Sequence, residues 1–560
     1  MKYKVINKEI DIKAVNQLRS ELNIPSLLAG LLYARGIKTV PEAIDYLEPD
    51  LFLLNPFLLR DMTKAVIRIA RAWEKEEKVV IFGDFDVDGI TSTAILMRFF
   101  EKINKKVDRI LPKQTQGHGL SVSIVEEVKK MGGTLIITVD NGVSSFDAVD
   151  RAKEYGIDVI ITDHHDLSHG EVPKAYAVIN PKQAEDRFSY KFLSGGGLAF
   201  FLARALADRF PEKEQLIGPD LWVLAAISTI ADVAPLTGEN RKIVQRGLSL
   251  IKGKSDIAGL DLLMSDFYPS KFFSARDVAF KIAPLVNVAG KFSLGDKALS
   301  LILDQDPTVL RSVVKELVDL NKKRKEMVEE ALTTLAPDAE TRAKANDLVL
   351  VLVGQQDSAI NGLLAARIKE QYQRPTIIFS LGEGGTLRGS GRSVDGFNIQ
   401  KAIEELSELH LGGGGHYMAA GLSINTTQIP AFRKKINEYA IQAFSEKPEK
   451  KWIIDAEVPV SALDENFFKA MKLMEPLGAK NDVPIFKIRG VHFLQKIGKK
   501  PYQVCQLGKQ SCFFFNNQDG KVEIPNNIPL NIIAEVNFSE GKPHLLVLDS
   551  EFEAEPSQGS

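Results

Sequence analysis

Short apolar runs alternate with longer helical patterns over the first part of the chain. Between the apolar runs, apolar residues recur at helical spacing, for example over 90–103 and 121–131. Continuous apolar strands separated by helices are typical of βαβ units, in which both faces of a parallel sheet are covered. The pattern therefore predicts an α/β fold with a parallel sheet. Its expected strands, all rich in β-branched residues, lie at 78–82, 134–139, 158–162 and 175–180.

The pattern changes twice further along the chain. A charged stretch over 308–336 has apolar residues at helical spacing and predicts a long connecting helix. A second α/β unit begins with a strand over 346–354, and short strand-like pieces near the C-terminus predict a small OB-like β-barrel. We therefore expect a multidomain α/β protein. Its expected parts are an N-terminal helical segment (1–55), a parallel-sheet domain (56–305), the connecting helix (306–340), a smaller α/β domain (341–446), the barrel (447–552) and a disordered tail (553–560).

Composition narrows the class of protein without identifying a function. The chain has 560 residues, of which 44% are hydrophobic and 26% charged, as in a globular protein of several domains. With two cysteines, a disulfide framework and a four-thiolate zinc site are excluded, and we expect a reducing cytoplasm. We expect neither a signal peptide nor a membrane span. Because the net charge is -2, a nucleic-acid-binding surface must be a local concentration of Lys and Arg.

Acidic residues and histidines follow the expected strands. The first strand leads into three aspartates, the second ends at Asp140, and the third ends at Asp163 followed by two histidines. An apolar helical stretch over 221–236 carries Asp232. Because the carboxyl ends of parallel strands meet at one edge of a sheet, we expect these side chains to lie together. The set at this edge is Asp84, Asp86, Asp88, Asp140, His164 and His165.

So many carboxylates in one place repel one another unless cations neutralise them. Oxygen ligands with one or two imidazoles suit Mn²⁺ or Mg²⁺, and two such ions can activate water and stabilise a phosphoryl group. A calcium loop fits less well, because the twelfth position counted from Asp84 is Ile95 and not a bidentate Glu. Single aspartates at strand ends are usually turn formers or helix caps. Their coincidence at three successive strand ends favours the metal site.

These motifs resemble the DHH phosphoesterase superfamily, which is named for the triplet present here at 163–165. The resemblance implies a centre of two Mn²⁺ or Mg²⁺ ions and is closest to the RecJ family. It implies catalytic roles for Asp84 and His165. The metal ligands that it implies are Asp86, Asp88, Asp140, His164 and Asp232, with Asp140 as the bridge.

The resemblance extends into the second α/β domain, where two segments look like the substrate-binding motifs of a DHHA1 domain. Small residues with a guanidinium suit a phosphate, and a run of four glycines permits close approach of a ligand. The residues concerned are Ser390, Arg392, Ser393, Gly414, Gly415 and His416. The segment that follows, over 474–491, resembles the beginning of the oligonucleotide-binding barrel of the family. Aromatic residues near lysines, such as Phe493 and Lys496, would hold single strands there.

Departures from the family pattern cluster in the expected substrate pocket. Members usually carry an arginine where this chain has Gln114, and Leu285 and Lys291 stand at two arginine positions of another motif. In the family, two of these arginines are associated with gripping the 5′ end of the strand. Lysine supplies charge without the bidentate fork of arginine. The substrate contacts expected here are Lys113, His118, Asn287 and Lys291.

By this resemblance we expect a metal-dependent exonuclease that degrades single-stranded DNA from 5′ to 3′, releases mononucleotides, and acts in recombination and repair. A single-strand-binding protein or a helicase is an expected partner, and a membrane is not. Two alternatives stay open because the pocket departs from the family. One is a phosphodiesterase for short RNA or dinucleotides, and the other is an inactive nucleic-acid-binding relative.

Overall fold

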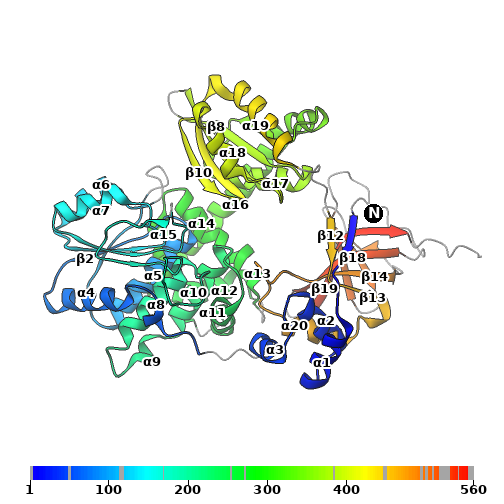
Figure 1. Cartoon of the computed structure of the whole chain (residues 1–560), viewed down its shortest axis with the longest axis horizontal. Helices are drawn as coiled ribbons and strands as arrows, with labels where there is room; N and C mark the ends of the chain where they lie inside the picture. The colour runs from blue at the N-terminus through cyan, green and yellow to red at the C-terminus, as the bar shows by residue number, and fades with distance from the viewer. Residues whose placement is uncertain are drawn as a thin grey trace, which may run out of the picture. The chain divides into compact units, whose positions relative to one another are not determined.

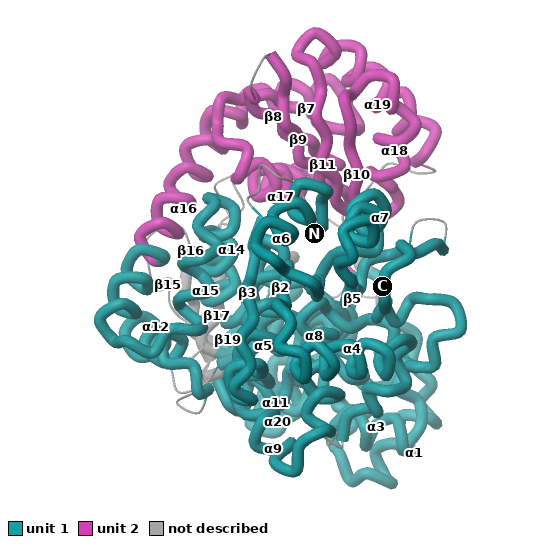
Figure 2. Tube along the Cα trace, turned by 90° about the vertical axis from the view of Figure 1, so that its left-hand side faces the viewer, with its two compact units in different colours: residues 1–317, 453–560 teal, residues 318–452 magenta. Residues whose placement is uncertain are grey.

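The chain forms two compact units in a computed structural model. One unit comprises residues 1–317 and 453–560, and the other comprises 318–452 (Figure 2). No helix among the described residues is both long enough and apolar enough to cross a bilayer. The structure describes residues 4–47, 52–112, 119–167, 170–251, 255–269, 273–382, 385–444, 451–491, 496–497, 502–507, 510–515, 530–539 and 542–552.

A parallel sheet of five strands is the centre of the larger unit. Its strand order is β3-β2-β4-β5-β6, and every neighbouring pair is parallel. The strands are β2 (Val79–Phe82), β3 (Asp108–Ile110), β4 (Leu135–Val139), β5 (Asp158–Thr162) and β6 (Ala177–Ile179). The predicted parallel sheet is thus confirmed, and β2 and β4 are wholly buried, as continuous apolar runs predict. The edge strand β3 was not predicted, because it is short and two of its three residues are charged.

Helices cover both faces of this sheet. Helices α6 and α7 pack on one face through a core of aliphatic residues, while α4, α5, α8 and α10 lie on the other (Figure 1). The helices of this region are α4 (Met62–Glu74), α5 (Val87–Lys102), α6 (Val122–Met131), α7 (Phe146–Glu154), α8 (Gly195–Ala207), α9 (Lys213–Leu216), α10 (Pro219–Ala231), α11 (Gly238–Leu250), α12 (Ala258–Phe267), α13 (Ala275–Asp277), the π-helical turn η4 (Val278–Ile282), α14 (Ala283–Lys291) and α15 (Gly295–Leu303).

One long helix, α16 (Pro307–Lys344), connects the two units. The sequence predicts a helix over 308–336, and the helix in fact continues past Pro337 for about two more turns. Proline usually ends a helix. Here the following residues are strong helix formers, Ala339 is buried against the second sheet's core, and Arg342 pairs with Asp338 one turn earlier. Packing and ion pairing therefore outweigh the lost backbone hydrogen bond.

The smaller unit contains a mixed sheet in the order β10-β11-β9-β8-β7. Strands β7 and β8 are parallel, whereas the other pairs are antiparallel. Helices α18 and α19 contribute to the core on one face, and α16 and α17 to the core on the other. The elements are β7 (Leu350–Gly354), α17 (Asn361–Tyr372), β8 (Thr376–Leu381), β9 (Thr386–Arg392), α18 (Ile399–Glu405), β10 (Gly412–His416), β11 (Ala419–Asn425) and α19 (Ile429–Ala443).

The first and last parts of the chain share one hydrophobic core. Leucines of the N-terminal helices pack with residues of a seven-stranded sheet whose order is β13-β14-β18-β19-β17-β16-β15. The expected tail at 553–560 lies outside the described residues, as do the side chains of Phe493 and Lys496. The elements are β1 (Lys4–Asn7), α1 (Ile12–Leu22), α2 (Ser26–Ala34), α3 (Val40–Leu47), β12 (Lys451–Ile454), β13 (Ala456–Pro459), α20 (Glu465–Leu473), β14 (Ile485–Val491), β15 (Lys496–Ile497), β16 (Tyr502–Leu507), β17 (Gln510–Phe515), β18 (Leu530–Ser539) and β19 (Lys542–Phe552).

Candidate metal centre

The sheet topology brings the acidic residues to one place. After β2 the chain adds β3 on one side and then crosses to place β4 on the other side of β2. In open α/β sheets, ligands bind at the carboxyl ends of the strands where the strand order reverses in this way. Asp84 lies two residues beyond the end of β2, Asp88 lies in the first turn of α5, and Asp140 directly follows β4. His164 lies two residues beyond the end of β5, at the same edge.

His164 lies at the middle of a cluster of three carboxylates. Its Nε2 lies 3.1 Å from Asp140 Oδ1 and 3.6 Å from Asp88 Oδ2. Its Nδ1 lies 3.8 Å from Asp232 Oδ2. Potential ligand atoms of Asp88, His164 and Asp232 all lie within 4.8 Å of one another, and so do those of Asp140, His164 and His165. The structure therefore places four of the five predicted ligands together, with His165 beside them.

Two atoms at the centre of this cluster have unsatisfied hydrogen-bonding capacity. Asp140 Oδ1 and His164 Nε2 are both buried and neither has a hydrogen-bond partner. Burial, and then the charges of Asp88 and its neighbours, raise the pKa of Asp140 well above its usual range. Burial lowers the pKa of His164 to about 4, which makes a neutral imidazole and thus a potential ligand. Neutral imidazole among mutually repelling carboxylates fits a divalent cation.

Asp232 resembles Asp140 in its electrostatics but not in its burial. It caps the C-terminus of α10, and its side chain is 29% exposed. Burial and the charges of Asp88 and Asp86 raise the pKa of Asp232 to about 8. A nearby cation would offset the repulsion between these carboxylates and favour the ionised form of Asp232. Asp232 therefore fits the predicted ligand set.

Asp84 and Asp86 belong to the same loop but make local contacts. The buried Asp84 carboxylate accepts a hydrogen bond of 2.6 Å from the N–H of Phe85. Asp86 caps α5 by accepting from the N–H of Gly89 at 3.0 Å. Both charges contribute to the raised pKa of Asp140, so both lie near the cluster. One oxygen of Asp86 therefore serves as a helix cap, in agreement with the simpler interpretation of a single aspartate at a strand end.

Backbone groups at the start of α8 hold the carboxylate of Asp88. The sequence did not predict this interaction. The N–H groups of Gly195 and Gly196 each donate to the Asp88 carboxylate at 2.8 Å, and the Ser228 hydroxyl also donates to it. A Cβ on Gly195 would lie 2.5 Å from Cβ of Asp140. The glycine run therefore makes room for one predicted ligand while it fixes another. The sequence signal was the three glycines at the start of an apolar helix.

Asp163 orients His165. Its Oδ1 lies 2.7 Å from Nδ1 of His165, and its Oδ2 accepts from the N–H of Val143 at 2.9 Å. Although burial disfavours the imidazolium, the hydrogen bond to Asp163 and its charge raise the pKa of His165 to about 9. Asn180 donates to the His165 carbonyl at 3.0 Å and fixes the backbone. His165 is thus held by its Nδ1, beside a cluster of carboxylates.

Helix α14 packs directly on the loop after β2. A Cβ on Gly290 would lie 1.6 Å from the carbonyl oxygen of Phe85, so no side chain fits there. Asn287 and Lys291 are four residues apart on this helix and share a face. Leu285, at one of the arginine positions of the family pattern, is buried in the core. Lys113 and His118 lie outside the described residues.

The predicted substrate residues of the smaller unit lie on strands β9 and β10, which β11 separates, or just after β9. Arg392 on β9 donates to the carbonyl of Gly391 at 2.9 Å, and its guanidinium lies near the N-terminus of α17, where a Cβ on Gly362 would approach it to 3.0 Å. Ser393 is buried and donates its hydroxyl to the carbonyl of Phe397 at 2.6 Å. Gly414, Gly415 and His416 are exposed on the edge strand β10.

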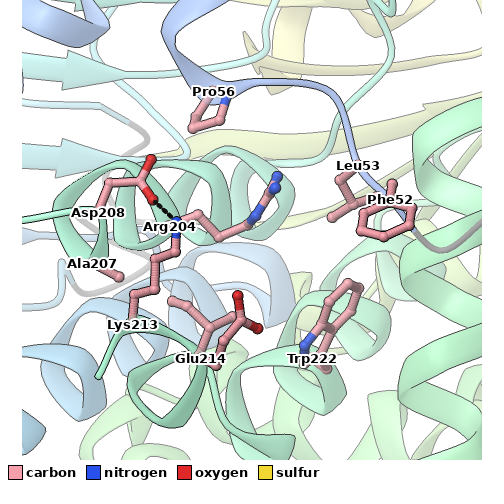
Figure 3. Close-up of a pocket in the computed structure, with 10 residues that line it drawn as sticks. Phe52, Leu53, Pro56, Arg204, Ala207, Asp208, Lys213, Glu214 and Trp222 are labelled. Carbon is pink, nitrogen blue, oxygen red and sulfur yellow. Dashed lines mark hydrogen bonds and ion pairs between the residues drawn. The ribbon is translucent and has the colours of Figure 1, made fainter. Parts of the chain in front are cut away.

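A cavity of about 310 Å³ lies elsewhere in the larger unit (Figure 3). Arg204 projects into it from the C-terminal half of α8, and Trp222 lines it from the first turn of α10. Asp232 and Gly195 mark the opposite ends of these two helices. At a rise of about 1.5 Å per residue, the cavity is roughly 15 Å from the carboxylate cluster along each helix. It is therefore separate from the candidate metal centre.

Comparisons with known proteins identify three parts of the chain. The model of the DHH family N-terminal domain matches residues 78–229, that of the DHHA1 domain matches 347–442, and that of the RecJ OB domain matches 454–543. The single-stranded-DNA-specific exonuclease RecJ of Bacillus subtilis (strain 168) is 30% identical over 557 residues. This match covers 96% of the present chain and 70% of that protein.

Solved structures agree with this result. The crystal structure of RecJ from Thermus thermophilus in complex with Mn²⁺ matches with a TM-score of 0.84 and 27% identity, over 99% of this chain and 80% of that chain. The structure of RecJ from the same source in complex with Mg²⁺ matches with a TM-score of 0.78 and 26% identity, over 99% and 79% of the two chains. Because it is 30% identical to the Bacillus subtilis relative and covers 70% of that protein, the chain belongs to the RecJ family.

Proposed function

We propose that this protein is a metal-dependent exonuclease that hydrolyses phosphodiester bonds of single-stranded DNA. The observation that carries the proposal is the pair of buried atoms, Asp140 Oδ1 and His164 Nε2, which lie 3.1 Å apart at the centre of a carboxylate cluster and make no hydrogen bond. The names of the relatives support the substrate, since the Bacillus subtilis protein is a single-stranded-DNA-specific exonuclease. The match to the RecJ OB domain supports a surface for the strand.

In this proposal Asp88, Asp140, His164 and Asp232 hold Mn²⁺ or Mg²⁺, and Asp86 completes a site for two ions. The ions supply Lewis acidity that activates water and stabilises charge on the phosphoryl group. The chain contributes a rigid frame for them. Asp88 is held by two backbone N–H groups and a hydroxyl, so its carboxylate is fixed in one orientation.

His165 contacts the scissile phosphate in this proposal. Its Nδ1 is held by Asp163, so Nε2 is the atom that donates to a phosphoryl oxygen. Asp84 supports the turn after β2 through its bond to the N–H of Phe85. Asn287 and Lys291 on α14 are proposed to approach the substrate beside this loop. Lys113 and His118, whose positions the structure does not describe, complete the proposed set of contacts in this unit.

The smaller unit is proposed to hold neighbouring phosphates. Ser390, Arg392 and the exposed residues Gly414, Gly415 and His416 supply a guanidinium, a hydroxyl and accessible backbone. Ser393 contributes by fixing the loop after β9 rather than by a free hydroxyl. By family resemblance we further propose 5′ to 3′ polarity, mononucleotide products, a role in recombination and repair in the cytoplasm, and work beside a single-strand-binding protein or a helicase.

A second candidate is a phosphodiesterase acting on short RNA or dinucleotides. It is favoured by the buried Leu285, because a core leucine there cannot grip a 5′ phosphate. The two candidate functions are distinguished by incubating the protein and Mn²⁺ with single-stranded DNA that is labelled at either end, with and without a 5′ phosphate. Stepwise loss from the 5′ end supports the exonuclease. Turnover of dinucleotides without cleavage of DNA contradicts it, and loss of all cleavage in D140A shows which site is responsible.

A further inference from the structure

Arg241 connects three segments of the larger unit by hydrogen bonds: its own helix α11, the end of α3 and the segment 474–476. This buried arginine lies in the first turn of α11 and donates to four backbone carbonyls. Its Nε donates to Tyr46 at 3.1 Å, and its Nη2 donates to Glu475 at 2.9 Å. Its Nη1 donates to Met474 and Pro476 at 3.4 and 3.3 Å. The guanidinium also stacks 3.9 Å from the ring centroid of Tyr46. One side chain thus fixes the loop 474–481, which is the first part of the connection from α20 to β14.

The same loop contacts the segment that follows Asp232. The N–H of Leu236 donates to the carbonyl of Ala479 at 2.8 Å, and a Cβ on Gly478 would lie 2.7 Å from the Leu236 side chain. The residue after Asp232 is Val233, which is 70% exposed and has a φ of 58°. A β-branched residue is strained in this left-handed region and persists there when the surroundings hold it. The contact at Leu236 is one such restraint.

Asp232 has little else to hold its carboxylate. Among the described residues no hydrogen-bond donor contacts it, and its one close basic group there is His164, whose Nδ1 lies 3.8 Å from Asp232 Oδ2. Asp88, in contrast, accepts from two N–H groups and a hydroxyl. The position of Asp232 therefore depends on its backbone, and the backbone depends on the segment 233–237.

We infer that the loop 474–481, gripped by Arg241, positions Asp232 for metal binding. This inference rests on the proposed metal centre and adds to it a contribution from the C-terminal region, which supplies none of the proposed ligands. Arg241 is a positioning residue, because it acts through the loop and not on the ion. Loss of the hydrogen bonds from Arg241 to the loop lets the strained segment at Val233 relax. The Asp232 carboxylate then moves away from His164.

Two variants test the inference, one at Arg241 on α11 and one at Asn481 within the loop itself. R241K keeps the charge but loses the fork that reaches four carbonyls. N481A leaves α11 intact and removes the buried amide that donates to Met474 and Pro476 at 3.2 and 2.7 Å. The matched control is R68K, a buried arginine that pairs with Glu77 and Asp158 at the amino ends of the strands. Each of the three variants changes hydrogen bonds of a buried side chain within the same unit.

The measurement is the affinity of the full chain for Mn²⁺ without nucleic acid, from the electron paramagnetic resonance of free Mn²⁺, below the melting temperature of every variant. We expect R241K and N481A to bind about tenfold more weakly, as for other residues that support metal ligands, and R68K to match the wild type. Wild-type affinity in R241K and N481A would overturn the inference alone, and so would equal weakening in R68K. A wild type that binds no Mn²⁺ would overturn the proposed metal centre as well.

Discussion

The carboxylate of Asp88 accepts a hydrogen bond of 2.8 Å from the backbone N–H of Gly195, at the first position of α8. Gly196 donates to the other oxygen of the same carboxylate. A glycine-rich helix N-terminus usually suggests a cradle for a substrate phosphate, because its N–H groups and dipole favour an anion. Here that anion is a side chain of the protein. Gly195 and Gly196 therefore hold a proposed ligand of the candidate metal centre and not a phosphate.

The first prediction concerns Gly195. In G195A the new Cβ would lie 2.5 Å from Cβ and 2.8 Å from Oδ1 of Asp140, so that carboxylate must move. We expect Mn²⁺ affinity to fall by about 100-fold or more, since even residues that only support ligands contribute about 10–100-fold. Calorimetric titration with Mn²⁺ measures the loss.

Gly197 is the matched control for this experiment. It lies in the same turn of α8, but a Cβ there would meet its neighbours at 3.4 Å, in ordinary contact. Alanine also has the better helix propensity, so G197A should retain stability to within roughly 1 kcal/mol and bind Mn²⁺ normally. Equal losses in G195A and G197A would show that the glycines matter for the helix and not for Asp140.

The second prediction concerns the charge of Asp140. Its φ is 63°, a conformation that asparagine tolerates well, so D140N removes charge with little backbone strain. Because burial and neighbouring carboxylates raise the pKa of Asp140, the metal-free D140N protein should melt at a higher temperature than the wild type. With Mn²⁺ at about 100 times its Kd the wild type should gain about 2.7 kcal/mol, and D140N much less. Thermal unfolding without and with Mn²⁺ tests both expectations. A lower melting temperature of metal-free D140N than of the wild type would contradict the expected stabilisation.

The candidate site shows which features a sequence can predict. Asp88, Asp140 and His164 were predictable because they follow three apolar strands, and the carboxyl ends of parallel strands meet at one edge. The strands β2, β4, β5 and β6 were predictable because they lie in largely apolar runs, whereas the edge strand β3, with two charged residues, was not. Ser228 was not, because nothing in a helical pattern indicates that one hydroxyl faces an aspartate 140 residues earlier in the chain.

The third prediction concerns Asp163. In D163N one of the donors that now face the carboxylate, at Val143 or His165, meets an amide NH₂ group instead of an oxygen. We expect kcat to fall by about 10–100-fold while Mn²⁺ affinity changes less, because Asp163 acts through His165. If so, D163N should add little to the loss in H165Q, whereas independent roles would give additive losses. Steady-state kinetics of the two single variants and the double variant distinguish these cases.

Other features depend on tertiary packing that no local pattern records. Leu18 and Leu31 look like ordinary core residues of a helical segment, yet they pack in one core with Phe486, more than 400 residues later. Helix α16 continues past Pro337 because Ala339 is buried and Arg342 pairs with Asp338. In the first case the packing partner is distant in sequence. In the second, packing and ion pairing outweigh the local preference of proline to end a helix.

The fourth prediction concerns pH. Although partial burial opposes its charge, hydrogen bonds from Arg68 and Thr134 lower the pKa of Glu77 below its ordinary value of 4.5. A carboxylate with a lowered pKa in the folded state stabilises the protein above its unfolded pKa, and this contribution is lost as pH falls through the folded pKa. E77Q should therefore melt several degrees lower than the wild type at pH 7. The difference should shrink below pH 4.5, and a constant difference would mean that the Glu77 charge is not responsible.

The last prediction separates two roles of the glycines on β10. A Cβ on Gly415 would lie 2.3 Å from the carbonyl oxygen of Ala419, and its φ of 158° further disfavours alanine, so G415A should disturb the β10–β11 hairpin and lower the stability of the smaller unit. Gly414 has no atom within 4 Å of its would-be Cβ. Thermal stability should therefore be unchanged in G414A. Any loss of affinity for single-stranded DNA in this variant then indicates that the DNA closely approaches β10. We expect its Kd to rise about tenfold, or about 1.4 kcal/mol, in fluorescence anisotropy at fixed salt. Wild-type affinity in G414A would mean that the glycine run builds the hairpin and contacts no phosphate.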